Sequence, residues 1–205
     1  MSTLDFYTAG LIAVTSGGSN RFSRALDRLQ QLAASLDFPL AVAGGLAGIV
    51  HGTGVTTLDI DVVIPGGKAD SFARAAEEMG FRWVRHSAAG WHRLEFQDPE
   101  GAVSVECLPA GQNSPRDPAD APPIPEPAEL GVATGFGYAD LPGWVLMKLV
   151  AGRDKDRYHL GEAIKGLDER AIAAIVLRLR PYPARYLNEF QKLVQTAHDE
   201  DSSNW

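Results

Sequence analysis

The chain has 205 residues, of which 45% are apolar and 22% are charged, and its formal net charge is −7. This composition is typical of an ordinary globular protein, and a chain of this length can bury a core without disulfides. The acidic balance argues against extended binding of duplex DNA, because such binding depends on neutralising many phosphates with Lys and Arg.

The sequence also limits the compartment in which we expect the protein. Cys107 is the single cysteine, so an internal disulfide is excluded and a reducing compartment is the simpler assumption. No Lys or Arg precedes Arg21, and the apolar run at 9–14 is too short for the core of an export signal. No apolar stretch approaches the length of a membrane span. We therefore expect a cytoplasmic protein with no membrane partner.

The first half of the chain alternates between helical and strand-like patterns. Apolar residues recur at helical spacing in three segments. These segments are 21–36, 46–51 and a stretch that ends at Gly80. Ser19 or Asn20 is the expected cap of the first helix, and Asp70 or Ser71 is the expected cap of the third.

Short apolar runs bounded by Gly, Pro or Asp predict strands between these helices. They lie at 40–43, 58–64, 81–84, 91–96 and 103–108. The last two runs flank residues 98–101, whose sequence Asp-Pro-Glu-Gly has the chemistry of a turn. The two runs therefore predict an antiparallel hairpin.

The composition changes at 109–127, where proline is dense. Proline lacks the amide hydrogen that helices and central strands need, so we expect an ordered surface loop or a stiff connector. Helical patterns follow at 141–151, at 154–164, from the cap Asp168 to residue 179, and from Pro183 onward. The sequence predicts an α/β (α+β) core with a short mixed sheet flanked by helices at 1–110, a connector at 111–140 and a helical part at 141–205.

Two aspartates occupy the strand predicted at 58–64. Side chains alternate between the two faces of a strand, so Asp59 and Asp61 share one face with Val63, and Ile60 faces the other way. Strands are depleted in Asp, and two neighbouring carboxylates repel each other. A divalent cation removes the repulsion, and Mg²⁺ prefers carboxylate and phosphate oxygens. The pair therefore indicates a magnesium site.

The pair Gly44-Gly45 follows the strand at 40–43 and precedes Asp59 by thirteen residues. Glycine lets the chain turn sharply and lets a ligand approach the backbone, and a helix start favours an anion. Together with the aspartates, these glycines describe a site that holds a metal-bound triphosphate from two sides. Glu106 is the candidate third carboxylate, and Glu95, one strand earlier, is its competitor.

These residues resemble the signature of the polymerase-beta-type nucleotidyltransferase superfamily. That signature has an apolar residue and Gly-Gly or Gly-Ser, then about a dozen residues, then Asp-x-Asp or Asp-x-Glu, and here it is matched by Ala43-Gly44-Gly45 and Asp59-Ile60-Asp61. Glu106 matches the third acid of the family, which is more often Asp. The segment LMKLVAGRDKDRYHLGEA at 146–163 is similar to a helical segment of the branch that contains AbiEii-type toxins and related uncharacterised bacterial proteins.

The resemblance implies a nucleotidyltransferase fold and an enzyme that transfers a nucleoside monophosphate from a nucleoside triphosphate to an acceptor hydroxyl, with release of pyrophosphate. It implies that the acids Asp59, Asp61 and Glu106 are catalytic and bind two Mg²⁺ ions, with Mn²⁺ as the alternative. The nucleotide, for which ATP is one candidate, would be bound by Gly44, Gly45, Lys148, Arg153 and Lys155.

Several alternatives stay open. The acceptor is tRNA or a protein if the chain is a toxin with a cognate antitoxin, and it is a small molecule if the chain is a modifying enzyme. A degenerate protein that binds a nucleotide or a partner without turnover is the other alternative, since an Arg that many relatives carry before the Asp pair is replaced by Gly54-Val55-Thr56-Thr57. Lys148 would then only extend along apolar surface, and the charged run at 153–157 would only join the helical part to the core.

Overall fold

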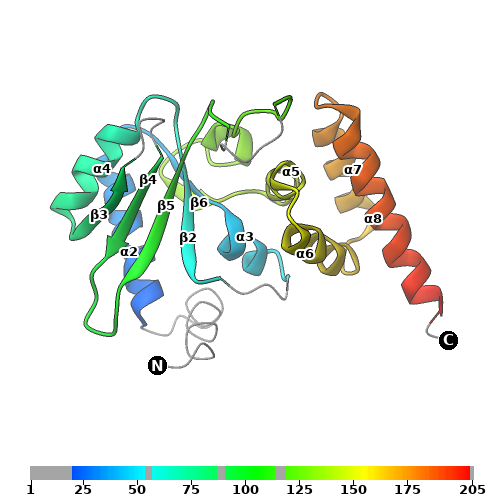
Figure 1. Cartoon of the computed structure of the whole chain (residues 1–205), viewed down its shortest axis with the longest axis horizontal. Coiled ribbons are helices and arrows are strands. Elements are labelled where there is room, and N and C mark those ends of the chain that lie inside the picture. Colours follow the sequence, from blue (N-terminus) through cyan, green and yellow to red (C-terminus); the bar gives the residue numbers. More distant parts are fainter. Residues whose placement is uncertain (1–19, 54–56, 87–90, 114–118, 204–205) are drawn as a thin grey trace.

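The computed structural model describes residues 20–53, 57–86, 91–113 and 119–203. Over these residues the chain forms a six-stranded mixed sheet with the order β3-β4-β5-β2-β1-β6. Helices lie on both sides of the sheet, and further helices extend away from it toward the C-terminus (Figure 1). The expected α/β class, with a short mixed sheet flanked by helices and a helical C-terminal part, is confirmed.

The sheet combines antiparallel and parallel pairs. Its strands are β1 (Leu40–Val42), β2 (Asp59–Ile64), β3 (Phe81–His86), β4 (His92–Phe96), β5 (Val103–Pro109) and β6 (Phe136–Tyr138). Strands β4 and β5 form the antiparallel hairpin that the sequence predicts. Strand β2 runs parallel to β5 and antiparallel to β1, so it lies in the middle of the sheet.

One face of the sheet is covered by α2 (Arg21–Ser35) and α4 (Ala69–Glu78). Their apolar residues pack with Ile60, Val62 and Val105 from the strands to form the first of two cores. Asn20 caps α2, because its Oδ1 accepts hydrogen bonds from the first backbone amides of the helix, as expected.

The predicted cap of α4 is wrong. Its N-cap is Lys68, and Asp70 lies inside the first helical turn. The turn at Pro65 causes the earlier start, since the amide of Lys68 already donates to the carbonyl of Pro65. An acidic side chain in the first turn still interacts favourably with the positive end of the helix dipole.

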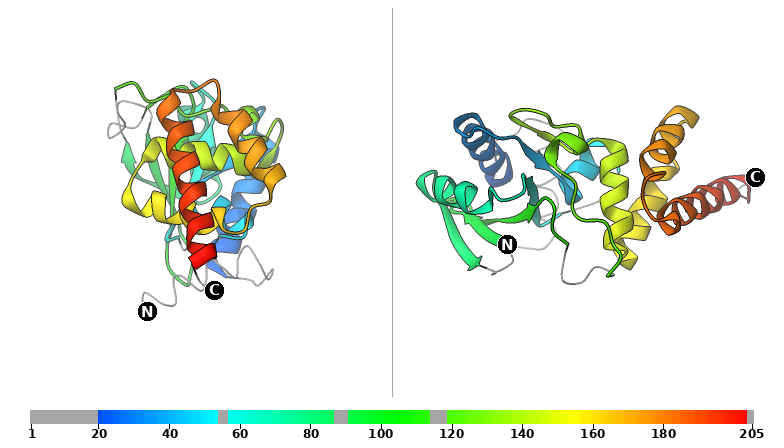
Figure 2. Two further views of the ribbon diagram at one scale, coloured as in Figure 1. Left: turned by 90° about the vertical axis from the view of Figure 1, so that its right-hand side faces the viewer. Right: turned by 90° about the horizontal axis from the view of Figure 1, so that it is seen from above.

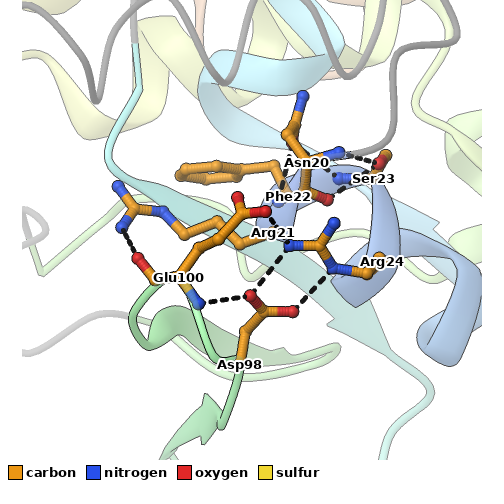
Figure 3. Close-up of polar contacts among 7 residues, drawn as sticks. All are labelled: Asn20, Arg21, Phe22, Ser23, Arg24, Asp98 and Glu100. Atoms are coloured by element: carbon orange, nitrogen blue, oxygen red, sulfur yellow. Dashed lines mark hydrogen bonds and ion pairs between the residues drawn. The ribbon is translucent and has the colours of Figure 1, made fainter.

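The N-terminus of α2 is fixed to the β4–β5 turn by a group of polar contacts (Figure 3). Arg24 donates from Nε to Asp98 Oδ2 over 2.7 Å and from Nη2 to Asp98 Oδ1 over 2.8 Å. Arg21 donates from Nη1 to the carbonyl of Glu100 over 3.0 Å. The guanidinium of Arg24 lowers the pKa of Asp98 below its ordinary value. These contacts hold the hairpin that carries β5 against the helix layer.

The opposite face of the sheet is covered only in part. Helix α3 (Gly44–Val50) contacts β2 and α5 (Leu141–Ala151), and Val63 and Ala41 from the strands join their apolar side chains in the second core. The rest of this face, on β3, β4 and β5, carries polar side chains that are exposed or partly exposed, such as Arg82 and Arg93. The site described below lies where the covered part meets the open part.

The C-terminal helices follow the predicted pattern. They are α6 (Asp154–Ile164), α7 (Glu169–Leu179) and α8 (Ala184–Ser203). Helix α6 lies beside α5, and α7 and α8 lie beyond them, farther from the sheet (Figure 2). Asp168 caps α7 as expected, because its side chain accepts from the amide of Ala171 over 2.7 Å. Phe190 of α8 is fully buried in the second core. None of the helices in the described ranges is long and apolar enough to span a bilayer.

Three elements differ from the sequence-based expectation. Helix α3 begins at Gly44, so the two glycines form its first turn instead of a separate break before residue 46. The connector at 111–140 contains a short 3-10 helix, η1 (Pro127–Leu130), and strand β6. Strand β6 is three residues long with a central glycine, and only its parallel pairing with β1 makes it a strand.

Candidate active site

The three acids singled out by the sequence lie on one face of two neighbouring strands. In the parallel pair of β2 and β5, Asp61 is the partner of Glu106 and Asp59 is the partner of Ser104. Asp59, Asp61 and Glu106 are partly exposed, while Ile60 between the aspartates is fully buried in the first core. The predicted alternation along β2 is confirmed, and the sheet register brings Glu106 beside Asp61.

The carboxyl groups influence one another strongly. Burial, followed by the charge of Asp59, raises the pKa of Asp61 from 3.8 to about 7. Glu106 adds to the rise, whereas the positive charges of Lys148 and Arg153 oppose it. A carboxylate pair that repels in this way is the arrangement that a cation or a further positive group stabilises.

Gly44 lies directly against Asp61. A Cβ added to Gly44 would lie 1.7 Å from Asp61 Oδ2, and the φ angle of Gly44 is +59°, so only glycine fits there without displacing the acid. A Cβ on Gly45 would lie 2.5 Å from Cβ of Thr57. The two glycines were expected to let a ligand approach the backbone. In the structure, the side chains of Asp61 and Thr57 occupy the space beside them.

Helix α5 holds the first turn of α3 in place. Trp144 is almost fully buried, and its indole Nε1 donates to the carbonyl oxygen of Gly44 over 2.8 Å. From the strand side, the amide of Ala43 donates to the carbonyl of Asp61 over 2.8 Å. The segment Ala43-Gly44, called the glycine corner below, is therefore hydrogen-bonded to β2 through Ala43 and to α5 through Gly44.

Lys148, Arg153 and Asp156 form an ion group between α5 and α6, with the carboxylate of Asp156 buried at its centre. Asp156 is fully buried, and its Oδ1 accepts from Lys148 Nζ over 2.7 Å while its Oδ2 accepts from Arg153 Nε over 2.5 Å. Lys148 is 7% exposed, whereas half of the Arg153 side chain is exposed. Both cations act on Asp61, and Arg153 also interacts with Asp59. The charges of Lys148 and Arg153 therefore act on the acids, while both side chains are bonded to Asp156.

Two candidates do not join this group. Lys155 is exposed on α6, and within the described ranges no hydrogen bond or ion pair ties its side chain to the acids. Glu95 lies two strands away from β2 and accepts from Arg82 Nη2 over 2.8 Å, so Glu106 is the acid placed next to Asp61. Residues 54–56, where relatives of the resembled family carry an Arg, lie outside the described residues.

The sequence analysis missed three side chains that shape the site. Thr57 is buried, and its Oγ1 donates to Asp59 Oδ1 over 2.8 Å. Arg93 is the register partner of Glu106 on β4. Trp144 holds Gly44, as described above. Counting back from the predicted turn at 98–101 would have placed Arg93 opposite Glu106, but no sequence pattern marks Thr57 or the contact of Trp144.

The donor set fits a hard divalent cation. Asp59 and Asp61 supply carboxylate oxygens on one face, and Mg²⁺ is commonly held by one or two carboxylates together with substrate phosphates and water. Burial is the main cause of the raised pKa of Asp61, and the neighbouring charges of Asp59 and Glu106 add to it. In the present geometry, no group of three or more His, Cys, Asp or Glu side chains in the described part of the chain is arranged to hold a metal ion. Glu106 therefore does not yet complete a three-acid site.

Comparison with known proteins gives matches among solved structures only. No protein-family model matches the chain, and no curated protein matches it. The antibiotic-resistance factor ANT(2'')-Ia in solution matches 90% of this chain and 96% of its own length, with 15% identity and a TM-score of 0.44. A crystal structure of ANT(2'')-Ia in complex with adenylyl-2''-tobramycin has 13% identity, covers 88% of this chain and 99% of its own, and has a TM-score of 0.40.

A complex of the CCA-adding enzyme with CTP is a third similar structure. It has 21% identity and a TM-score of 0.36, and the match covers 51% of this chain and 23% of that enzyme. At these levels of similarity, the activity of this chain has to be inferred from its own residues.

Proposed function

We propose that the chain is a nucleotidyltransferase that transfers a nucleoside monophosphate from a nucleoside triphosphate to an acceptor hydroxyl and releases pyrophosphate. The observation that carries the proposal is the register of β2 and β5, which places Asp61 beside Glu106, with Asp59 on the same face. Gly44 lies against Asp61, and the positive charges of Lys148 and Arg153 lower the pKa of Asp61. Carboxylates opposite cations are the groups that in-line displacement at phosphorus requires.

The residues on and beside β2 have distinct parts in this proposal. Asp59 and Asp61 would hold Mg²⁺, which supplies charge neutralisation on the triphosphate and activation of the acceptor hydroxyl when it is bound. Thr57 fixes the carboxylate of Asp59 through its hydroxyl. Gly44 and Gly45 let Asp61 and Thr57 pack directly against the first turn of α3, and the terminal phosphates would lie beside this turn.

The three positively charged residues near the acids differ in how they would act on the triphosphate. Arg153 has an exposed guanidinium and can contact the triphosphate directly. Lys148 is buried and bonded to Asp156, so it would act on the site through its positive charge and not by direct contact with the nucleotide. Lys155 is exposed next to them on α6, and contact with the nucleotide would come from its flexible side chain. The whole arrangement therefore favours an anionic substrate despite the acidic net charge.

The test is incubation of the full chain with each α-³²P-labelled nucleotide, Mg²⁺ and cell extract. Label transferred to tRNA, to protein or to small molecules identifies the acceptor class, and growth arrest on expression would support the toxin hypothesis. We expect the Asp59→Asn/Asp61→Asn double variant to lose transfer by at least about 1,000-fold, since electrostatic contributions to catalysis are of this size.

The matched control is Asp27→Asn, which removes an exposed acid on α2 and should leave transfer unchanged. Label that persists at the wild-type level in the double variant refutes the proposal. Calorimetry with a nucleotide, with and without Mg²⁺, identifies the degenerate alternative, because that alternative gives binding by the wild type without transfer.

A further inference from the structure

Arg93 on β4 contacts the third acid of the site. Its Nε lies 3.4 Å from Glu106 Oε1 and donates a hydrogen bond to Ser104 Oγ over 3.0 Å. The Arg93 side chain is 45% exposed and that of Glu106 is 36% exposed, so water reaches the contact and both side chains can move. The ion pair lies on the face of the sheet that carries polar side chains on β3, β4 and β5, and no helix among the described residues covers it.

Glu106 lies between the carboxylic acid Asp61 on β2 and the positively charged Arg93 on β4. Strand β5 lies between β2 and β4, so Asp61, Glu106 and Arg93 form one row across three strands. The carboxylate of Glu106 lies between Arg93 and the position where Asp59 and Asp61 would hold a cation, so the two positive groups compete for it. No three acids in the described ranges are arranged for a metal in this geometry, and Glu106 is in contact with Arg93.

We propose that Arg93 is a positioning residue that competes with the divalent cation for Glu106, and thereby sets the cation affinity of the site. The inference rests on the proposed function, because it requires a cation at Asp59 and Asp61. A bound cation would draw Glu106 away from the guanidinium, and Arg93 would keep its hydrogen bond to Ser104. An exposed ion pair of this kind shifts an equilibrium by roughly two- to fivefold.

The experiment measures Mn²⁺ binding to the full chain without nucleotide, by electron paramagnetic resonance of free Mn²⁺. We expect Arg93→Gln to bind Mn²⁺ about two- to fivefold more tightly than the wild type, because Glu106 is released. The matched control is Arg82→Gln, which removes another arginine of the same sheet face, paired with Glu95 and outside the row of Asp61. The control should bind Mn²⁺ with the wild-type affinity.

A double-mutant cycle separates competition for Glu106 from the general field of a positive charge. In the Glu106→Gln background, Arg93→Gln should no longer change the Mn²⁺ affinity if Arg93 acts through Glu106. An equal gain in affinity with and without Glu106 would overturn the inference. Circular dichroism and thermal unfolding of each variant verify that the fold is kept.

The outcomes also separate this inference from the proposed function. A wild type that binds Mn²⁺, with an Arg93→Gln variant of equal or weaker affinity, overturns the role of Arg93 and leaves the proposed function in place. A wild type without saturable Mn²⁺ binding overturns the inference about Arg93, whereas the proposed function is decided by label transfer, because substrate phosphates supply part of the cation's ligands.

Discussion

The indole nitrogen of Trp144 donates a hydrogen bond to the carbonyl oxygen of Gly44 over 2.8 Å, although the two residues are 100 positions apart in the chain. Trp144 lies on α5, one helical turn before Lys148, whose ammonium lies 5.9 Å from the centre of the indole ring. One helix therefore fixes both the glycine corner and a cation that acts on Asp61.

Replacing Trp144 with Phe should lower the free energy of unfolding by about 1–3 kcal/mol, because the carbonyl of Gly44 loses its donor while most of the ring packing is kept. Trp144→Ala also removes the ring and should cost about 3–5 kcal/mol. Urea denaturation of both variants measures these losses. A Phe variant as stable as the wild type would show that the hydrogen bond does not stabilise the corner.

Gly44→Ala tests the close contact between Gly44 and Asp61. The added Cβ would meet Asp61 Oδ2 at 1.7 Å, and the left-handed backbone adds about 1–2 kcal/mol of strain. The control is Gly52→Ala, because Gly52 has a φ angle of +77° and nothing within 4 Å of an added Cβ. Chemical denaturation should show a larger loss for Gly44→Ala than for Gly52→Ala, and equal losses would contradict the packing argument.

Asp156→Asn removes the charge that holds Lys148 and Arg153. Asp156 is fully buried, and breaking a buried ion pair typically costs about 3–5 kcal/mol, since uncompensated charge is left behind. The control is Asp154→Asn, two residues earlier on α6, where the carboxylate is fully exposed and pairs with Arg157. We expect a lower unfolding temperature for the first variant and almost no change for the second. Similar effects of both would argue against an organising role for Asp156.

The contact of Arg24 with Asp98 predicts a dependence of stability on pH. Arg24 lowers the pKa of Asp98 in the folded state below its value in the unfolded chain, which is about 3.9. The stabilisation is therefore fully present above that unfolded value and is lost as the pH falls through the folded pKa. The wild type should be more stable than Asp98→Asn at pH 7, and the difference should shrink below about pH 4.

Guanidinium denaturation at several pH values measures this difference. Asp27→Asn, on the exposed side of the same helix, serves as the control and should show no such loss of advantage on acidification. A difference between wild type and Asp98→Asn that is constant from pH 7 to about pH 3 would rule out the ionic contribution.

Local patterns were enough to predict part of the site. The alternation of side chains in β2 placed Asp59 and Asp61 on one face, because strand geometry depends only on neighbouring residues. The same holds for the hairpin of β4 and β5, whose turn residues lie between the strands. The cap of α4 was predicted wrongly, because the turn at Pro65 decides where that helix begins, and strand β6 was missed because it exists only through its pairing with β1.

The sequence by itself determined the residue types and the local faces: two acids side by side on a strand, glycines before them, and a lysine on an apolar helix. Only the tertiary structure decided the partners. The parallel pairing of β2 with β5 set Glu106 beside Asp61, the neighbouring β4 set Arg93 beside Glu106, and the packing of α5 brought Trp144 to Gly44. These contacts join segments far apart in the chain. They depend on how the strands and helices pack together, and the local spacing of apolar residues in the sequence does not specify them.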